Sequence, residues 1–177
     1  MTAPSLARLA LRQLRSAQGD VLKAVEELDE DQLRWRPEHG PQSIAWHVWH
    51  MARWDDYMLE RLGGEGVWEP EGVQSRWGWP EGIELGEEEA GTGLDDNLAE
   101  ALSFPPKAQL LEYVKAVFER SQRHVASLSD EYLAESWEEG GRATKADAVF
   151  GFAGHDYQHG GMIAAIKGLL GLRGTPD

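Results

Sequence analysis

The chain of 177 residues contains no cysteine, and this absence excludes several kinds of chemistry. Disulfide bonds, cysteine-ligated zinc and cysteine nucleophiles are ruled out, so any metal site must use histidine, aspartate or glutamate. A chain without cysteine also fits a reducing compartment, and we therefore expect the protein to be cytoplasmic.

Positive charge and long apolar runs are scarce as well. The chain has 17 lysines and arginines against 31 acidic residues, a formal net charge of −14. Proteins that bind nucleic acids need basic side chains to displace phosphate counterions, so we expect no DNA or RNA partner. There is no run of about 18 apolar residues, so no membrane-spanning helix is expected. An acidic surface also weakens attraction to anionic membranes.

The alternation of apolar and polar residues that is typical of β-strands is scarce, whereas apolar residues at helical spacing are frequent. The predicted helices cover about 5–33, 43–62, 104–128 and 144–170. Thr144 and Asp147 resemble a capping box at the start of the last helix, and the pair Gly63-Gly64 ends the second. These signals predict an all-α four-helix bundle with little or no sheet.

Between the second and third predicted helices lies a connection, 63–104, that is rich in glycine, glutamate and tryptophan. Structureless loops longer than about 15 residues are uncommon in compact domains and are usually functional. This connection is long enough to cross the bundle, so the two helices need not be antiparallel. Trp68, Trp77 and Trp79 could anchor it. We expect one domain, 1–177, with 63–104 as an inserted lid rather than a partly disordered flap.

Two histidines, His155 and His159, lie four residues apart in an apolar stretch of the last helix. This spacing places both imidazoles on one helical face. They are either two core histidines with hydrogen-bond partners or two ligands of one metal ion. The second helix offers a third ligand, His47 or His50. Periodicity places His47 in the apolar stripe and His50 beside it, without deciding between them.

Two motifs carry a resemblance to a known family. The segment "SIAWHVWHMARWDDYML" (43–59) and the segment "HDYQHGGMI" (155–163) are similar to the helix-two and last-helix signatures of the DinB/YfiT-like superfamily of metalloenzymes, which is distinct from the DinB DNA polymerases. The resemblance covers nearly the whole chain and implies a four-helix bundle with a long crossover between helices two and three. Met162 stands where many members have glutamine, and Tyr57 where the most similar branch often has histidine.

The resemblance implies that His50, His155 and His159 bind a divalent metal ion, with zinc and nickel the foremost candidates. It makes His47 a pocket residue instead of a ligand. The candidate pocket residues are Trp46, His47, Trp49, Arg53, Trp54 and Tyr57. Carboxylates usually orient such imidazoles, and here we expect one from Asp156 or from the first or third helix. The tryptophans either pack the core or wall a pocket between the second helix and the lid.

Characterised relatives include S-transferases and isomerases that use a low-molecular-weight thiol. The resemblance therefore implies a metal-dependent S-transferase acting on a small electrophilic substrate. Two alternatives stay open: a hydrolase that uses metal-bound water, and a non-enzymatic, stress-associated metal-binding protein with a fourth protein ligand. The motifs assign no catalytic residue. A homodimer is a further expectation.

Overall fold

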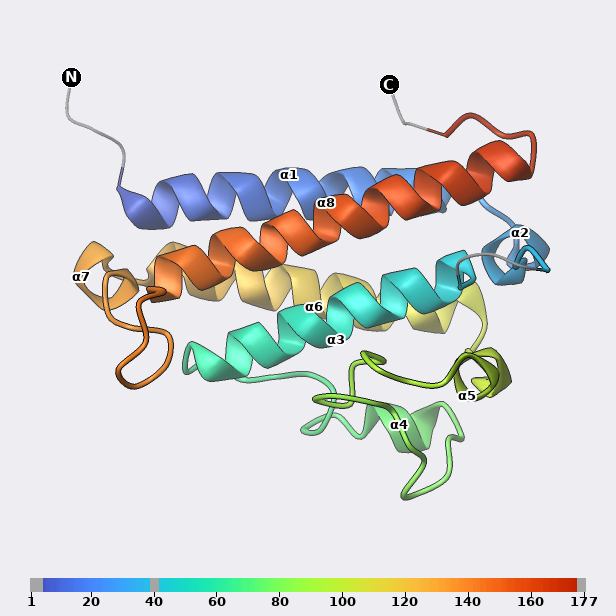
Figure 1. Ribbon diagram of the computed structural model, residues 1–177, viewed down its shortest axis with the longest axis horizontal. Helices are drawn as coiled ribbons and strands as arrows, with labels where there is room; N and C mark the ends of the chain where they lie inside the picture. Colours follow the sequence, from blue (N-terminus) through green and yellow to red (C-terminus); the bar gives the residue numbers. More distant parts are fainter. Residues whose placement is uncertain (1–4, 39–41, 175–177) are drawn as a thin grey trace.

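The computed structural model describes residues 5–38 and 42–174. Four long helices form a bundle: α1 (Leu6–Glu26), α3 (Ile44–Arg61), α6 (Lys107–Ser127) and α8 (Lys145–Leu169) (Figure 1). Four shorter helices occupy the connections: α2 (Glu30–Arg34), α4 (Val73–Arg76), α5 (Asp96–Ala101) and α7 (Asp130–Leu133). In the described ranges, β-structure is limited to two isolated bridges, Glu87 with Thr92 and Ser136 with Thr144. The all-α prediction is confirmed.

The helix starts follow the capping signals in the sequence. Ser43 accepts a hydrogen bond from the backbone of Trp46 at the start of α3. Thr144 and Asp147 form the predicted capping box at the start of α8. The first predicted helix is divided in two, because Asp29 caps a separate helix α2 through its own capping box. Each cap satisfies backbone N–H groups that the helix itself leaves unpaired.

The long helices form two layers. Helices α1 and α8 lie side by side and run in the same direction, and α3 and α6 form the second layer with the opposite direction (Figure 1). α3 packs against α8, and α6 packs against α1. The crossover returns the chain to the end of the bundle where α3 begins, so α3 and α6 are parallel. None of the helices in the described part of the chain is both long and apolar enough to span a membrane.

The crossover covers the outer side of α3 (Figure 1). It contributes Trp68, Trp79 and Phe104 to the main hydrophobic core, where they surround Trp49 of α3. Trp49 and Trp68 are almost completely buried, with ring centroids 6.4 Å apart. Because helices pack on one side and the crossover on the other, α3 is buried nearly all round. These tryptophans pack the core.

A buried polar cluster joins all four long helices. The side-chain amide of Gln18 on α1 donates to Asp55 of α3 at 2.6 Å and to Ser121 of α6 at 3.3 Å. Asp156 of α8 is fully buried beside Asp55. Burial raises the pKa of Asp55 to about 7 and raises that of Asp156 well above its usual range. A protonated Asp156 can therefore donate a hydrogen bond to the Asp55 carboxylate.

The buried face of α8 differs from the sequence-based prediction. Helical spacing in the sequence predicts one apolar stripe through Phe152, His155 and His159, with Asp156 about a quarter turn away from it. Instead, α8 buries Ala153 and Asp156 completely, while Phe152 and His155 are half-buried. The reason is the partner carboxyl on α3, Asp55, with which the buried Asp156 interacts.

Candidate metal centre

Three histidines from two antiparallel helices converge where α3 crosses α8. His50 comes from α3, and His155 and His159 come from successive turns of α8. One potential ligand atom from each lies within 4.8 Å of the other two. The Nε2 atoms of His50 and His155 are 3.1 Å apart. Nitrogens bound tetrahedrally at zinc–nitrogen distances would be about 3.3 Å apart, so this pair already has the spacing that a shared ion requires.

Burial keeps the three imidazoles neutral. It lowers the pKa of His50 to about 3 and that of His155 to about 4. The pKa of His159 falls to about 2, first because of burial and then because the neighbouring imidazoles would repel its charge. Neutral imidazole has a free nitrogen lone pair, which is the form that binds a metal. At neutral pH the cluster is therefore ready to accept a cation without losing protons.

Hydrogen bonds orient two of the three rings. The backbone carbonyl of Ala90 accepts a hydrogen bond from Nδ1 of His50. Because a carbonyl only accepts, Nδ1 carries the proton, and the Nε2 that faces His155 carries the lone pair. Nδ1 of His159 lies 2.8 Å from Nδ1 of His47. When His159 donates in this pair, its Nε2 is free to bind an ion.

The expected carboxylate partners are absent from these contacts. Among the hydrogen bonds of the described residues, none joins an aspartate or glutamate to His50, His155 or His159. The Ala90 carbonyl and His47 make the contacts that we predicted for carboxylates. Asp156, the candidate on α8, is directed at Asp55 instead. The expectation was wrong, because the Ala90 carbonyl lies at Nδ1 of His50 and His47 lies at Nδ1 of His159.

A tight loop of the crossover aims the Ala90 carbonyl at His50. Glu88 and Glu89 have positive φ angles of 50° and 54°, a conformation that costs an ordinary residue about 1 to 2 kcal/mol. Arg53 of α3 donates from Nη2 to the Glu88 carbonyl at 3.3 Å and from Nε to the Glu89 carbonyl at 3.1 Å. The buried Arg53 side chain thus holds the strained loop against α3.

Gly91 lets this loop approach α3 closely. It has φ 91°, and a Cβ atom placed there would lie 2.8 Å from the Trp49 ring and 2.9 Å from the Trp46 ring. It would also lie 3.3 Å from Nδ1 of His50, the atom that bonds Ala90. A side chain at this position would push the loop away from the histidine. Glycine is therefore required by contact as well as by conformation.

The other predicted pocket residues fall into two groups. Trp46 stacks on the His50 ring, with centroids 4.5 Å apart and planes 15° apart. Trp54 lies edge-on to His155 at 6.4 Å, and its indole N–H donates to Thr92 at 3.0 Å. These two residues, together with His47, do border the histidines.

The second group lies farther from the histidines. Trp49 is completely buried in the core under the crossover. Tyr57 packs edge-on against Trp54, and its hydroxyl accepts a hydrogen bond from Arg61. Both lie on the helix that carries His50, so the sequence alone could not separate them from the residues at the site.

An open cavity of about 390 Å³ adjoins the histidine cluster. It is lined by Trp54, Trp137, Ala143, Asp147, Ala148, Gly151, Phe152 and His155. Its walls are α3, α8 and the segment between α7 and α8, whereas we expected a pocket between the second helix and the crossover. Sequence reasoning missed Trp137 and Ala143, because they lie in an irregular segment where no periodicity indicates which way a side chain points.

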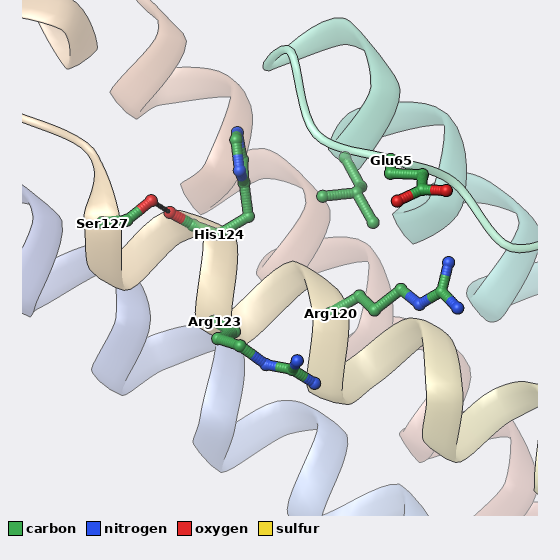
Figure 2. Close-up of a pocket in the computed structure, with 6 residues that line it drawn as sticks. Glu65, Arg120, Arg123, His124 and Ser127 are labelled. Carbon is green, nitrogen blue, oxygen red and sulfur yellow. Dashed lines mark hydrogen bonds between the residues drawn. The ribbon is translucent and has the colours of Figure 1, made fainter.

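A second cavity lies on another side of α3, between α6 and the segment that follows α3 (Figure 2). Arg120, Arg123, His124 and Ser127 of α6 line it, with Glu65 opposite, and its volume is about 540 Å³. Arg120 already pairs with Glu71, and Nε2 of His124 donates to the Leu62 carbonyl. None of the clustered histidines lines this larger cavity, so size does not identify the site.

Comparisons with known proteins agree with the geometry. The crystal structure of a conserved protein from Enterococcus faecalis superposes with a TM-score of 0.76 over 96% of this chain and 99% of that one, at 17% identity. At that identity the likeness shows the shared fold. A search of curated proteins finds no match. The model of the DinB superfamily matches residues 13–163, which include all three clustered histidines, and the chain therefore belongs to the DinB superfamily.

Proposed function

We propose that the protein is a metal-dependent enzyme in which His50, His155 and His159 bind one divalent cation, zinc or nickel. The observation that carries the proposal is the convergence of three neutral imidazoles from α3 and α8 beside an open cavity. Bound at these nitrogens, the ion would supply a Lewis acid that lowers the pKa of a bound thiol or water and polarises an electrophile.

The composition of the cluster favours an enzyme over a closed, purely structural site. Within the described residues, no aspartate or glutamate joins the three histidines as a fourth ligand. Three protein ligands are typical of catalytic zinc, whereas structural zinc usually has four. His155 lines the cavity, so a small molecule there would meet the cluster directly.

Within this class, we propose transfer of a low-molecular-weight thiol to a small electrophile. The thiol sulfur would form the new carbon–sulfur bond, and the leaving group or the adjacent carbon would take up the thiol proton. The protein's own part is to hold the imidazoles in one tautomer through Ala90 and His47, and to place the electrophile in the apolar cavity beside His155. Membership of the DinB superfamily supports this reaction class.

Metal binding is tested by elemental analysis and calorimetric titration of the purified chain with zinc and nickel. We expect one ion per chain. His159→Ala should remove the ion, because two remaining imidazoles hold it far more weakly; an affinity loss of at least about 100-fold is expected. His124→Ala is the matched control, since His124 lies on α6 and its ring donates to the Leu62 carbonyl, away from the clustered histidines. Full stoichiometry and affinity in His159→Ala would refute the three-histidine site.

The reaction is tested separately with the metal-loaded chain. Glutathione-, mycothiol- and bacillithiol-type thiols are each incubated with haloaromatic, epoxide and maleate-type electrophiles, and adducts are measured by mass spectrometry. Turnover that one thiol supports and that chelation abolishes would confirm the transferase. Metal-dependent ester or amide hydrolysis without thiol would establish the hydrolase instead. Tight metal binding with no turnover of either kind would favour a non-enzymatic metal-binding protein.

A further inference from the structure

The cavity beside His155 has walls made almost entirely of apolar groups. Trp54 and Trp137 flank Phe152, with ring centroids 6.1 and 6.2 Å from it, so three aromatic rings form a continuous surface. Ala143, Ala148 and Gly151 complete the walls without adding a polar side chain. The volume of about 390 Å³ lies within the range of about 300 to 1,000 Å³ that is usual for small-molecule sites.

Charge in the cavity disfavours an anionic ligand. Of the described residues that line it, none is a lysine or arginine, and the one acidic residue is Asp147. The Asp147 carboxylate accepts hydrogen bonds from the backbone and hydroxyl of Thr144, which lower its pKa and keep it charged. A ligand carboxylate in the cavity would meet this charge and find no cation to pair with.

A cationic ligand is disfavoured for a different reason. The guanidinium of Arg61 lies over the Trp137 ring, with its Cζ 4.8 Å from the ring centroid, so a cation beside that ring would meet a like charge. An uncharged, largely apolar body is thus the ligand chemistry that the walls accept.

We propose that this cavity binds the uncharged aromatic body of the substrate, with the reactive group directed past His155 toward the histidine cluster. This inference rests on the proposed function, because it assigns the substrate class of the same site. Trp54 is the residue that connects the two regions, since it lines the cavity and its ring lies 6.4 Å from that of His155.

Gly151 controls the free space in the cavity. It lines the cavity from the middle of α8, and a Cβ atom built there meets nothing within 4 Å. Glycine inside a helix is destabilising by about 1 kcal/mol relative to alanine, so a larger side chain at this position would fill the cavity without destabilising the helix. Gly154, one turn later on the same helix, is equally uncrowded and does not line the cavity. The two glycines therefore form a matched pair.

The test uses the full, metal-free chain, so that it does not depend on the metal or on turnover. Binding of 2-naphthylmethanol is measured by calorimetry or ligand-detected NMR, with 2-naphthoate and 2-naphthylmethylammonium as charged analogues of the same size. We expect the neutral probe to bind at least about tenfold more tightly than either charged analogue. Gly151→Leu should weaken neutral-probe binding at least about tenfold, Gly151→Ala less, and Gly154→Leu by less than about twofold.

Both leucine variants should fold, because leucine has a higher helix propensity than glycine; circular dichroism checks this. Equal binding by Gly151→Leu and Gly154→Leu would overturn the proposal, as would preferential binding of a charged analogue or no binding of the neutral probe. The chain could bind the neutral probe in a way that depends on Gly151 and yet show neither metal affinity nor turnover. That result would refute the proposed function and leave the ligand site established. Metal-dependent turnover of small anionic electrophiles alone would support the proposed function and refute the cavity as the site of an uncharged aromatic substrate.

Discussion

At the scale of single residues, the histidine cluster depends on a backbone atom of the crossover. The Ala90 carbonyl fixes which nitrogen of His50 carries the proton. Gly91 permits the approach, and Arg53 holds the loop through two carbonyls. The binding strength of the site should therefore respond to a change in a residue that touches no metal.

Gly91→Ala is expected to weaken zinc or nickel binding by about tenfold while the chain stays folded, because loss of an orienting hydrogen bond to a ligand typically costs 10- to 100-fold in metal affinity. Chelator competition measures the affinity. Gly93→Ala is the control, since Gly93 also has a positive φ, 73°, and its added Cβ would meet nothing within 4 Å. Equal affinity losses in the two variants would show that backbone strain, rather than the contact with His50, matters.

The sequence predicted the three clustered residues but not what orients them. His155 and His159 share a helix, so their spacing alone placed them on one face. His50 entered through the resemblance, because periodicity did not decide between His47 and His50; the structure buries both, with His47 against His159. The role of Ala90 had no signal in the sequence, since a carbonyl is present at every residue and only the fold decides where it points.

At the scale of elements, α3 and α8 are joined by a carboxyl pair as well as by the histidines. Asp55 and Asp156 are both fully buried. Together with Gln18, they link both helices to α1. The helix boundaries could be predicted from caps such as Ser43 and Thr144, because capping is a local interaction. The inward rotation of Asp156 could not, because it depends on a partner that lies 101 positions earlier in the sequence.

The carboxyl pair should make stability fall as pH rises. In the folded chain the pKa of Asp55 is about 7 and that of Asp156 is also raised, against a normal value of 3.8. Below these raised pKa values the folded state therefore keeps protons that the unfolded state releases. The stabilisation is complete below about pH 4. The Asp55 share is lost as pH rises through about 7 and the Asp156 share at higher pH, at no more than about 1.4 kcal/mol per pH unit for each carboxyl.

Asp156→Asn should reduce this dependence, because it removes one of the two titrating carboxyls and its amide can donate permanently to Asp55. Relative to the natural chain, we expect the variant to gain stability from pH 5 to pH 8 in urea unfolding. Comparing the two chains cancels the opposite effect of the buried histidines, whose lowered pKa values reduce stability below about pH 6.5. Asp20→Asn, on the exposed side of α1, should track the natural chain. A constant difference between Asp156→Asn and the natural chain at every pH would contradict the shared proton.

At the scale of the whole molecule, the crossover and the bundle share one hydrophobic core. Val67, Trp68, Val73 and Trp79 of the crossover belong to the same cluster as Ile44, Trp49 and Val114 of the long helices. The length and the tryptophan content of this connection suggested order. The sequence could not show that its tryptophans pack against the outer face of α3, since an irregular segment has no periodicity that predicts packing.

Unfolding should therefore occur in one cooperative step. Trp68→Ala should lower the free energy of unfolding by about 3 to 5 kcal/mol, as for other fully buried aromatic residues. Trp77→Ala, at a half-buried position, should cost less. Urea unfolding followed by tryptophan fluorescence and by far-UV circular dichroism should give coincident curves. A fluorescence transition at lower urea than the loss of helix would show that the crossover unfolds by itself.

Helix α1 pairs in parallel with α8, and α3 pairs in parallel with α6. This arrangement has a kinetic consequence. His50 and His155 are separated by 105 residues, and the Ala90 carbonyl comes from the crossover between them. During synthesis, the chain therefore has no complete cluster until α8 has emerged and docked. A cation cannot serve as an early template around which the helices assemble. Occupancy of the histidines would instead report that folding has finished, and its main effect would be to slow the undocking of α8.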